Sequence, residues 1–197
     1  MAPFAARSSK RPMLSAFLTT TGVVAIAEIG DKTQLLSLLL AARFRRPWPI
    51  LAAILVATLA NHVLAAWIGV WIEQWLTPEV LRWVLGASFL AMAVWTLIPD
   101  KLDDTPVVGK WGAFLTTLVA FFIAEIGDKT QLATTALAAR HESVAMVAAA
   151  STLGLMVANV PVVLAGEKLM ARLPLTPVRY IAAAAFALLG ITALLAW

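Results

Sequence analysis

Two identical nine-residue stretches, 27–35 and 124–132, carry the residues whose types and spacing could do chemistry. Each reads Ala-Glu-Ile-Gly-Asp-Lys-Thr-Gln-Leu and lies inside a long apolar run. In a helix the Glu, the Asp and the Gln are three residues apart, so their side chains project along one face. A carboxylate or an ammonium group at the centre of a bilayer costs about 2.5–3.5 kcal/mol. We therefore expect these groups to face each other, water or a bound ion rather than lipid.

The charges of the two stretches indicate a site for one divalent cation. Four carboxylates and two lysines leave a net charge of −2, which one such ion would neutralise. Carboxylate, amide and carbonyl oxygens are hard ligands that suit Ca²⁺, Mn²⁺ or Mg²⁺. The chain has no cysteine and the stretches have no histidine, which argues against copper or zinc as the main substrate. The predicted metal ligands are Glu28, Asp31, Glu125 and Asp128.

Other residues have supporting roles in this interpretation. We expect Lys32 and Lys129 to balance the charge of the carboxylates when no cation is bound. Gly30 and Gly127 are the predicted points at which a helix breaks, which is tolerable only where the backbone lines a cavity. The supporting cation ligands are predicted to be Thr33, Gln34, Asn61, Thr130, Gln131 and Asn159. For the two asparagines, hydrogen bonding between helices is an equally good interpretation.

The composition indicates that these residues are positioned by an all-α integral membrane protein. Of the 197 residues 61% are hydrophobic and 13% are charged, and the mean hydropathy is +0.88. The apolar runs predict six transmembrane helices at about 14–42, 50–72, 80–98, 113–139, 144–165 and 178–197. The first and the fourth exceed the ~20 residues that a crossing needs, so we expect them to bend or break at the motif. The basic residues lie between apolar runs, where they set topology, and no nucleic-acid partner is expected.

The second half of the chain repeats the first at a spacing of 97 residues. Residues 16–20 recur as 113–117, and the motif glutamates have the same spacing. We interpret 1–197 as a single transmembrane domain with three-helix repeats at 13–98 and 112–197, joined by a central loop at 99–111. An odd number of crossings inverts the second repeat and brings the motifs face to face near the midplane. Basic residues are more numerous on the central-loop side, which favours N- and C-termini outside.

The duplicated Glu-x-Gly-Asp-Lys-Thr motif in a six-span chain of this length resembles the Ca²⁺:H⁺ antiporter-2 family. That family includes Golgi and chloroplast manganese and calcium transporters and bacterial manganese exporters. The resemblance covers essentially the whole chain and implies cation/proton exchange that depends on the four motif carboxylates. The short central loop is similar to that of bacterial members, which implies a multi-pass exporter of the bacterial inner (plasma) membrane. Its expected substrate is Mn²⁺ or Ca²⁺, with protons as the coupling ion and no cofactor.

Three other interpretations of the motifs are open. The first is a buried ion-pair network that only fixes helix packing. The second is an intramembrane aspartyl protease, although such enzymes need two different aspartate contexts and these two are identical, so no enzyme is expected. The third is a passive divalent-cation channel, against which the inverted repeat favours alternating access.

Overall fold

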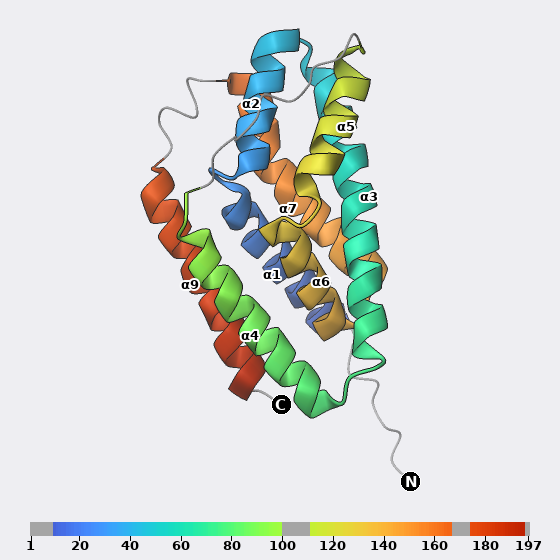
Figure 1. Cartoon of the computed structure of the whole chain (residues 1–197), viewed down its shortest axis with the longest axis vertical. Helices are drawn as coiled ribbons and strands as arrows, with labels where there is room; N and C mark the ends of the chain where they lie inside the picture. The colour runs from blue at the N-terminus through green and yellow to red at the C-terminus, as the bar shows by residue number, and fades with distance from the viewer. Residues whose placement is uncertain (1–9, 100–110, 167–173, 196–197) are drawn as a thin grey trace.

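The computed structural model describes residues 10–99, 111–166 and 174–195, which form helices and short connections without any strand (Figure 1). The predicted central loop lies outside these residues except at its two ends. The helices of the first half are α1 (Lys10–Glu28), α2 (Lys32–Phe44), α3 (Pro47–Glu73) and α4 (Pro78–Thr96). Those of the second half are α5 (Ala113–Glu125), α6 (Lys129–His141), α7 (Val144–Ala165) and α9 (Leu175–Leu195).

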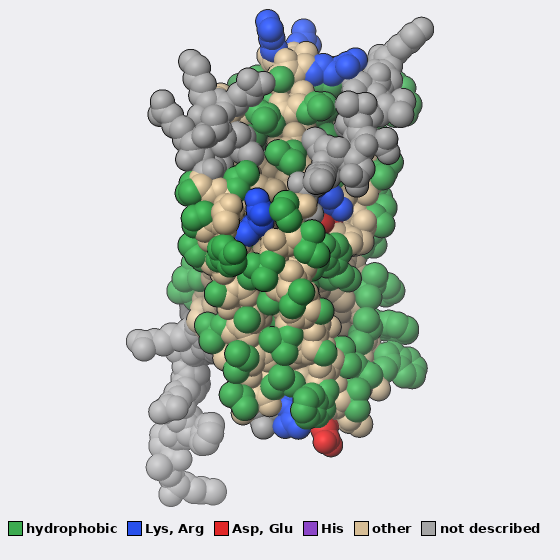
Figure 2. Space-filling model, turned by 60° about the vertical axis from the view of Figure 1, so that its left-hand side comes forward, with side chains coloured by type: hydrophobic (Ala, Val, Ile, Leu, Met, Phe, Trp, Pro, Cys, Tyr) green, Lys and Arg blue, Asp and Glu red, His purple; other side chains and the backbone are tan. Residues whose placement is uncertain are grey.

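The described helices confirm the prediction of an all-helical membrane protein. Four of them, α3, α4, α7 and α9, are long and apolar enough to cross a membrane. The pair α1 and α2 gives a fifth candidate span, bent by 66° at its break, and α5 is a shorter apolar helix. Figure 2 shows hydrophobic side chains over much of one face, with Lys and Arg side chains at the two ends and in two small patches near mid-height. Large apolar side chains such as Trp67 and Trp71 are exposed on α3, as a lipid-facing surface requires.

Each motif ends one helix and begins the next. Gly30 and Gly127 have φ values of 81° and 72°, in the left-handed region that glycine adopts without steric cost. The following residues, Asp31 and Asp128, are the N-caps of α2 and α6. An N-cap carboxylate accepts a hydrogen bond from a backbone N–H that the helix leaves unpaired. The glycine thus opens the break, and the aspartate starts the new helix.

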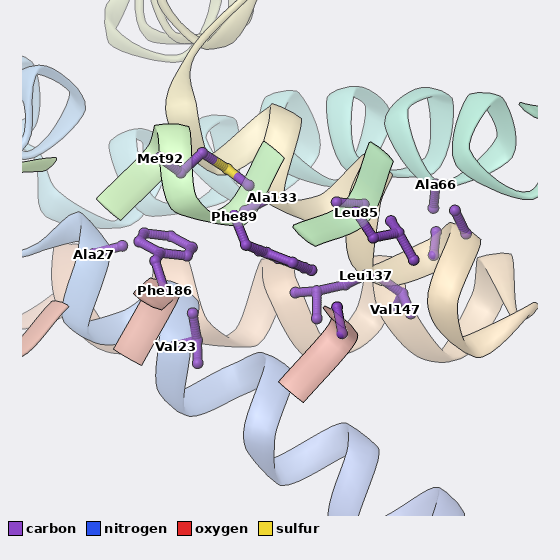
Figure 3. Close-up of a cluster of buried hydrophobic side chains, with 14 of the residues drawn as sticks. Val23, Ala27, Ala66, Leu85, Phe89, Met92, Ala133, Leu137, Val147 and Phe186 are labelled. Carbon is purple, nitrogen blue, oxygen red and sulfur yellow. The ribbon is translucent and has the colours of Figure 1, made fainter. Parts of the chain in front are cut away.

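The hydrophobic core has two parts. The first, which we call the α4–α9 core, combines residues of α4 and α9 with residues of α1, α3, α6 and α7; Phe89, Leu137 and Phe186 are its largest fully buried members (Figure 3). The second, the α2–α5 core, draws its residues from α1, α2, α3, α5 and α7. It contains no described residue of α4 or α9. The pair α4 and α9 is therefore packed against α1 and α6 and is not part of the core around α2 and α5.

The close approach of α3 to α6 yields a first prediction. A Cβ atom on Gly69 would lie 2.1 Å from the carbonyl oxygen of Thr135, whereas one on Gly22 of α1 would meet nothing within 4 Å. We expect Gly69→Ala to lower the free energy of unfolding by about 1–3 kcal/mol through overpacking. Gly22→Ala, the matched control, is expected to leave it unchanged or raise it by up to about 1 kcal/mol. Thermal unfolding in detergent checks both, and equal stability of the two variants would contradict the close contact.

Candidate cation site

The two breaks bring the carboxylates of both motifs together inside the protein. The side chains of Glu28, Asp31, Glu125 and Asp128 are all buried, at 1% exposure or less. One carboxylate oxygen from each of Glu28, Asp31 and Asp128 lies within 4.8 Å of the others, a spacing suited to one metal ion. Glu125 is near enough to Glu28 and Asp128 for their charges to interact. The four carboxylates, which we call the carboxylate group, thus come from both halves of the chain.

Two ion pairs connect the motifs crosswise. Lys32 Nζ lies 3.2 Å from Asp128 Oδ1, and Lys129 forms an ion pair with Asp31. Each lysine therefore pairs with the aspartate of the other motif. The two pairs have different surroundings, because the Lys129 side chain is 3% exposed and the Lys32 side chain is 30% exposed. Identical sequences consequently occupy unequal environments.

Each glutamate has one oxygen that accepts a hydroxyl hydrogen bond. Thr33 Oγ1 donates to Glu28 Oε2 at 2.7 Å, and Thr58 Oγ1 donates to Glu125 Oε1 at 2.6 Å. The second oxygen of each, Glu28 Oε1 and Glu125 Oε2, is buried and accepts no hydrogen bond from the described part of the chain. A buried carboxylate oxygen without a partner costs free energy. These two atoms are therefore the places where a cation or a proton would bind most favourably.

The glutamines fasten the broken turns. Gln34 Oε1 accepts a hydrogen bond from the Gly30 N–H, and Gln131 Oε1 accepts one from the Gly127 N–H, both at 2.7 Å. The Nε2 of Gln34 donates to the Ala158 carbonyl of α7 at 2.9 Å. Both side-chain oxygens thus accept hydrogen bonds from the glycines of the breaks and stabilise the turns that precede the two aspartates.

The remaining predicted supporting residues fall into two situations. Thr130 Oγ1 donates to Asp128 Oδ2 at 2.9 Å. The Nδ2 of Asn61 donates to the Phe122 carbonyl at 3.1 Å, and the Asn61 side chain also approaches Glu125. Thr130 and Asn61 therefore lie at the edge of the carboxylate group. Asn159 accepts a hydrogen bond from Ser37 Oγ at 2.5 Å and donates to the Leu155 carbonyl at 3.1 Å. In this arrangement Asn159 connects α7 to α2.

Sequence reasoning missed Thr58 and Ser37. The equivalent of Thr58 at the repeat spacing is Leu155, so comparing the two halves gives no signal for it. A signal does exist in the helix period, since Thr58 precedes Asn61 by three residues and lies on the same face of α3. Ser37 follows Gln34 at the same spacing on α2.

Comparison with known proteins adds independent findings. A family model described as "Divalent cation/proton antiporter GDT1" matches residues 16–104 and 113–197. A Vibrio cholerae protein named "Putative manganese exporter" is 51% identical over 180 residues, which make up 91% of this chain and 90% of that protein. A GDT1-like protein of Synechocystis is 27% identical over 183 residues, covering 82% of this chain and 87% of its own length. No solved structure matches the chain.

The unequal burial of the two ion pairs yields a second prediction. Lys129→Met would remove the cation from a buried pair and is expected to lower the free energy of unfolding by about 3–5 kcal/mol. Lys32→Met would also leave a buried aspartate, Asp128, without its lysine, but the lysine that is lost is partly exposed, so the expected loss is smaller than for Lys129→Met. The double variant Asp31→Asn/Lys129→Met should regain part of the loss. Unfolding in detergent measures these values, and equal losses for the two single variants would show that the pairs are equivalent.

Proposed function

This chain belongs to the GDT1 family of divalent cation/proton antiporters, and from that membership we propose that it exports Mn²⁺ from the cytoplasm in exchange for protons. The family is one of transporters rather than enzymes. The observation that carries the proposal is the buried carboxylate group, in which one oxygen of each glutamate accepts no hydrogen bond from the described residues. The name of the Vibrio cholerae relative favours Mn²⁺, and Ca²⁺ is the second candidate because the same hard oxygen ligands suit it.

Charge balance explains how one site exchanges the two kinds of ion. Four carboxylates and two lysines carry a net charge of −2, so one divalent cation neutralises the group. Two protons neutralise it equally well. A neutral group crosses a low-dielectric barrier at far lower cost than a charged one. Competition between the metal and protons for the same oxygens therefore couples their movements in opposite directions.

A cation that enters the carboxylate group must compete with the lysines. Asp31 and Asp128 supply two of the three converging oxygens, and each is ion-paired across the motifs. Cation binding then requires that Lys129 and Lys32 release the aspartates. We infer that the lysines hold the site closed between ions. If the ion pairs served only to pack the helices, buried glutamate oxygens without a hydrogen bond from the described residues would add a cost and no benefit.

We propose that the cation site opens alternately to the two sides of the membrane. The site lies between two inverted three-helix repeats, 13–98 and 112–197, which together span the membrane six times. Figure 1 supports this arrangement, because α1 and α6 lie toward one end of the molecule and α2 and α5 toward the other. The chain thus passes through the two breaks in opposite directions. The left-handed residues that end α2 and α6, Arg45 and Glu142, have the same spacing as the motifs. The distribution of basic residues along the sequence supports an orientation with both termini outside.

Transport in proteoliposomes with an imposed pH gradient tests the function. We expect Mn²⁺ to move against the direction of proton flow, and Ca²⁺ and Mg²⁺ to move more slowly. A protein-free liposome with the same gradient is the control. Mn²⁺ uptake that ignores the gradient would indicate a channel, and no uptake of any divalent cation would exclude transport by this site.

The shared site predicts that neither motif works alone. Asp31→Asn and Asp128→Asn should each reduce Mn²⁺ exchange by about 100-fold or more, because each removes one of the three converging carboxylate charges to which the cation would bind. Glu79→Gln, in the exposed first turn of α4, is the matched control and should exchange normally. Normal exchange by either aspartate variant would contradict a site built from both motifs.

A further inference from the structure

Helices α4 and α9 carry arginines at matching positions. Arg82 and Arg179 are 97 residues apart, which is also the spacing of the two motifs. Each precedes a phenylalanine, Phe89 or Phe186, by seven residues. The correspondence between α4 and α9 thus extends over two turns and includes one charged and one aromatic residue.

The matched phenylalanines have the same surroundings, but the matched arginines do not. Phe89 and Phe186 are both fully buried in the α4–α9 core (Figure 3). Arg179 lines a narrow hollow whose wall also includes Asp31 and Lys129, the more deeply buried ion pair. Arg82 instead lies over the ring of its neighbour Trp83, with 5.6 Å between the guanidinium carbon and the ring centroid. One arginine therefore borders the cation site, and the other has its own contact away from that hollow.

The packing of α4 and α9 explains this difference. The pair lies in the core with α1 and α6 and contributes no described residue to the α2–α5 core. In an inverted repeat α1 corresponds to α5, α6 to α2 and α4 to α9. If the two halves exchanged roles, helices α4 and α9 would therefore pack against α2 and α5. In that second state Arg82 would border Asp128 and Lys32, as Arg179 now borders Asp31 and Lys129.

We propose that Arg179 and Arg82 are alternating gate residues, each of which lowers the affinity of the carboxylate group for the divalent cation in one of the two access states. This inference rests on the proposed antiport between inverted repeats. A guanidinium is always charged, and its repulsion of a metal ion is strong where water is scarce. The arginine that borders the site favours release of the cation, because it adds a positive charge next to the aspartate that the cation would bind. Movement of α4 and α9 removes that arginine and brings its counterpart to the other motif.

Equilibrium binding of Mn²⁺ to the purified protein in detergent tests the charge effect without requiring transport. Arg179→Gln should bind Mn²⁺ tighter than the wild type by about fivefold or more, because a nearby positive charge is lost. Arg179→Lys keeps the charge and should bind as the wild type does. Arg46→Gln, at an exposed position that makes no side-chain capping bond, is the matched control. Unchanged or weaker binding by Arg179→Gln, or an equal change in Arg179→Lys, would overturn the proposal.

Sidedness tests the alternation. In oriented proteoliposomes, Arg179→Gln should lower both KM and kcat for Mn²⁺ on one face of the membrane, and Arg82→Gln should do so on the opposite face. A purely structural role would reduce kcat on both faces and leave KM unchanged. The chain has no cysteine, so an impermeant thiol reagent on a single Arg46→Cys substitution reports the orientation. A change of KM on the same face in both variants would overturn the alternation.

The two proposals fail in distinguishable ways. A wild type that binds Mn²⁺ but moves it without regard to the pH gradient refutes antiport, while the binding comparison still decides the role of Arg179. A wild type that binds neither Mn²⁺ nor Ca²⁺ overturns both proposals. A wild type that exchanges Mn²⁺ for protons, with Arg179→Gln unaltered in affinity and KM, overturns only the arginine proposal.

Discussion

The crossed ion pairs between the motifs are the interaction on which the rest of the structure depends. Asp31 and Lys129 are both buried, and a charge in that position is tolerable only beside an opposite charge. Each aspartate and lysine of these pairs lies at the start of the helix that follows a break, so the two breaks bring them together. Gly30 and Gly127 provide the opening, and the aspartates then cap the new helices. The same nine residues therefore create the break and the charges that the break must hold.

This arrangement leaves some of the carboxylate oxygens of the site without a hydrogen-bond donor among the described residues. The lysines satisfy the aspartates, and the threonines satisfy one oxygen of each glutamate. One oxygen on Glu28 and one on Glu125 accept nothing from the described residues. The free energy that this costs has to be supplied by the packing of the two cores, since polar groups in the site do not supply it. The consequence is a group that gains from binding either a metal ion or protons, as an exchanger requires.

Much of this architecture is predictable from the sequence, and the features that are not predictable share one physical reason. The helix bounds follow from apolar runs, and the breaks follow from a glycine beside a charge in a run too long for one crossing. The gathering of the four carboxylates follows from the cost of leaving them in lipid. The crossing of the pairs does not follow, because two identical motifs allow Lys32 to pair with either aspartate. The different burial of Lys32 and Lys129 cannot be read from identical strings, and Thr58 has no counterpart in the second half.

Unequal surroundings for identical motifs have to come from their neighbours. The α4–α9 core encloses the half of the molecule that contains α1 and α6, so the pair formed by Lys129 is the buried one. In the proposed alternation the chain adopts the reverse arrangement, in which the pair formed by Lys32 is the buried one. On that proposal the two arrangements differ in free energy through residues that the halves do not share, such as Thr58, and both would be populated if the difference were no more than a few kcal/mol. Binding to the carboxylate group can then shift the balance, because the bound ion changes how much each buried lysine contributes to stability.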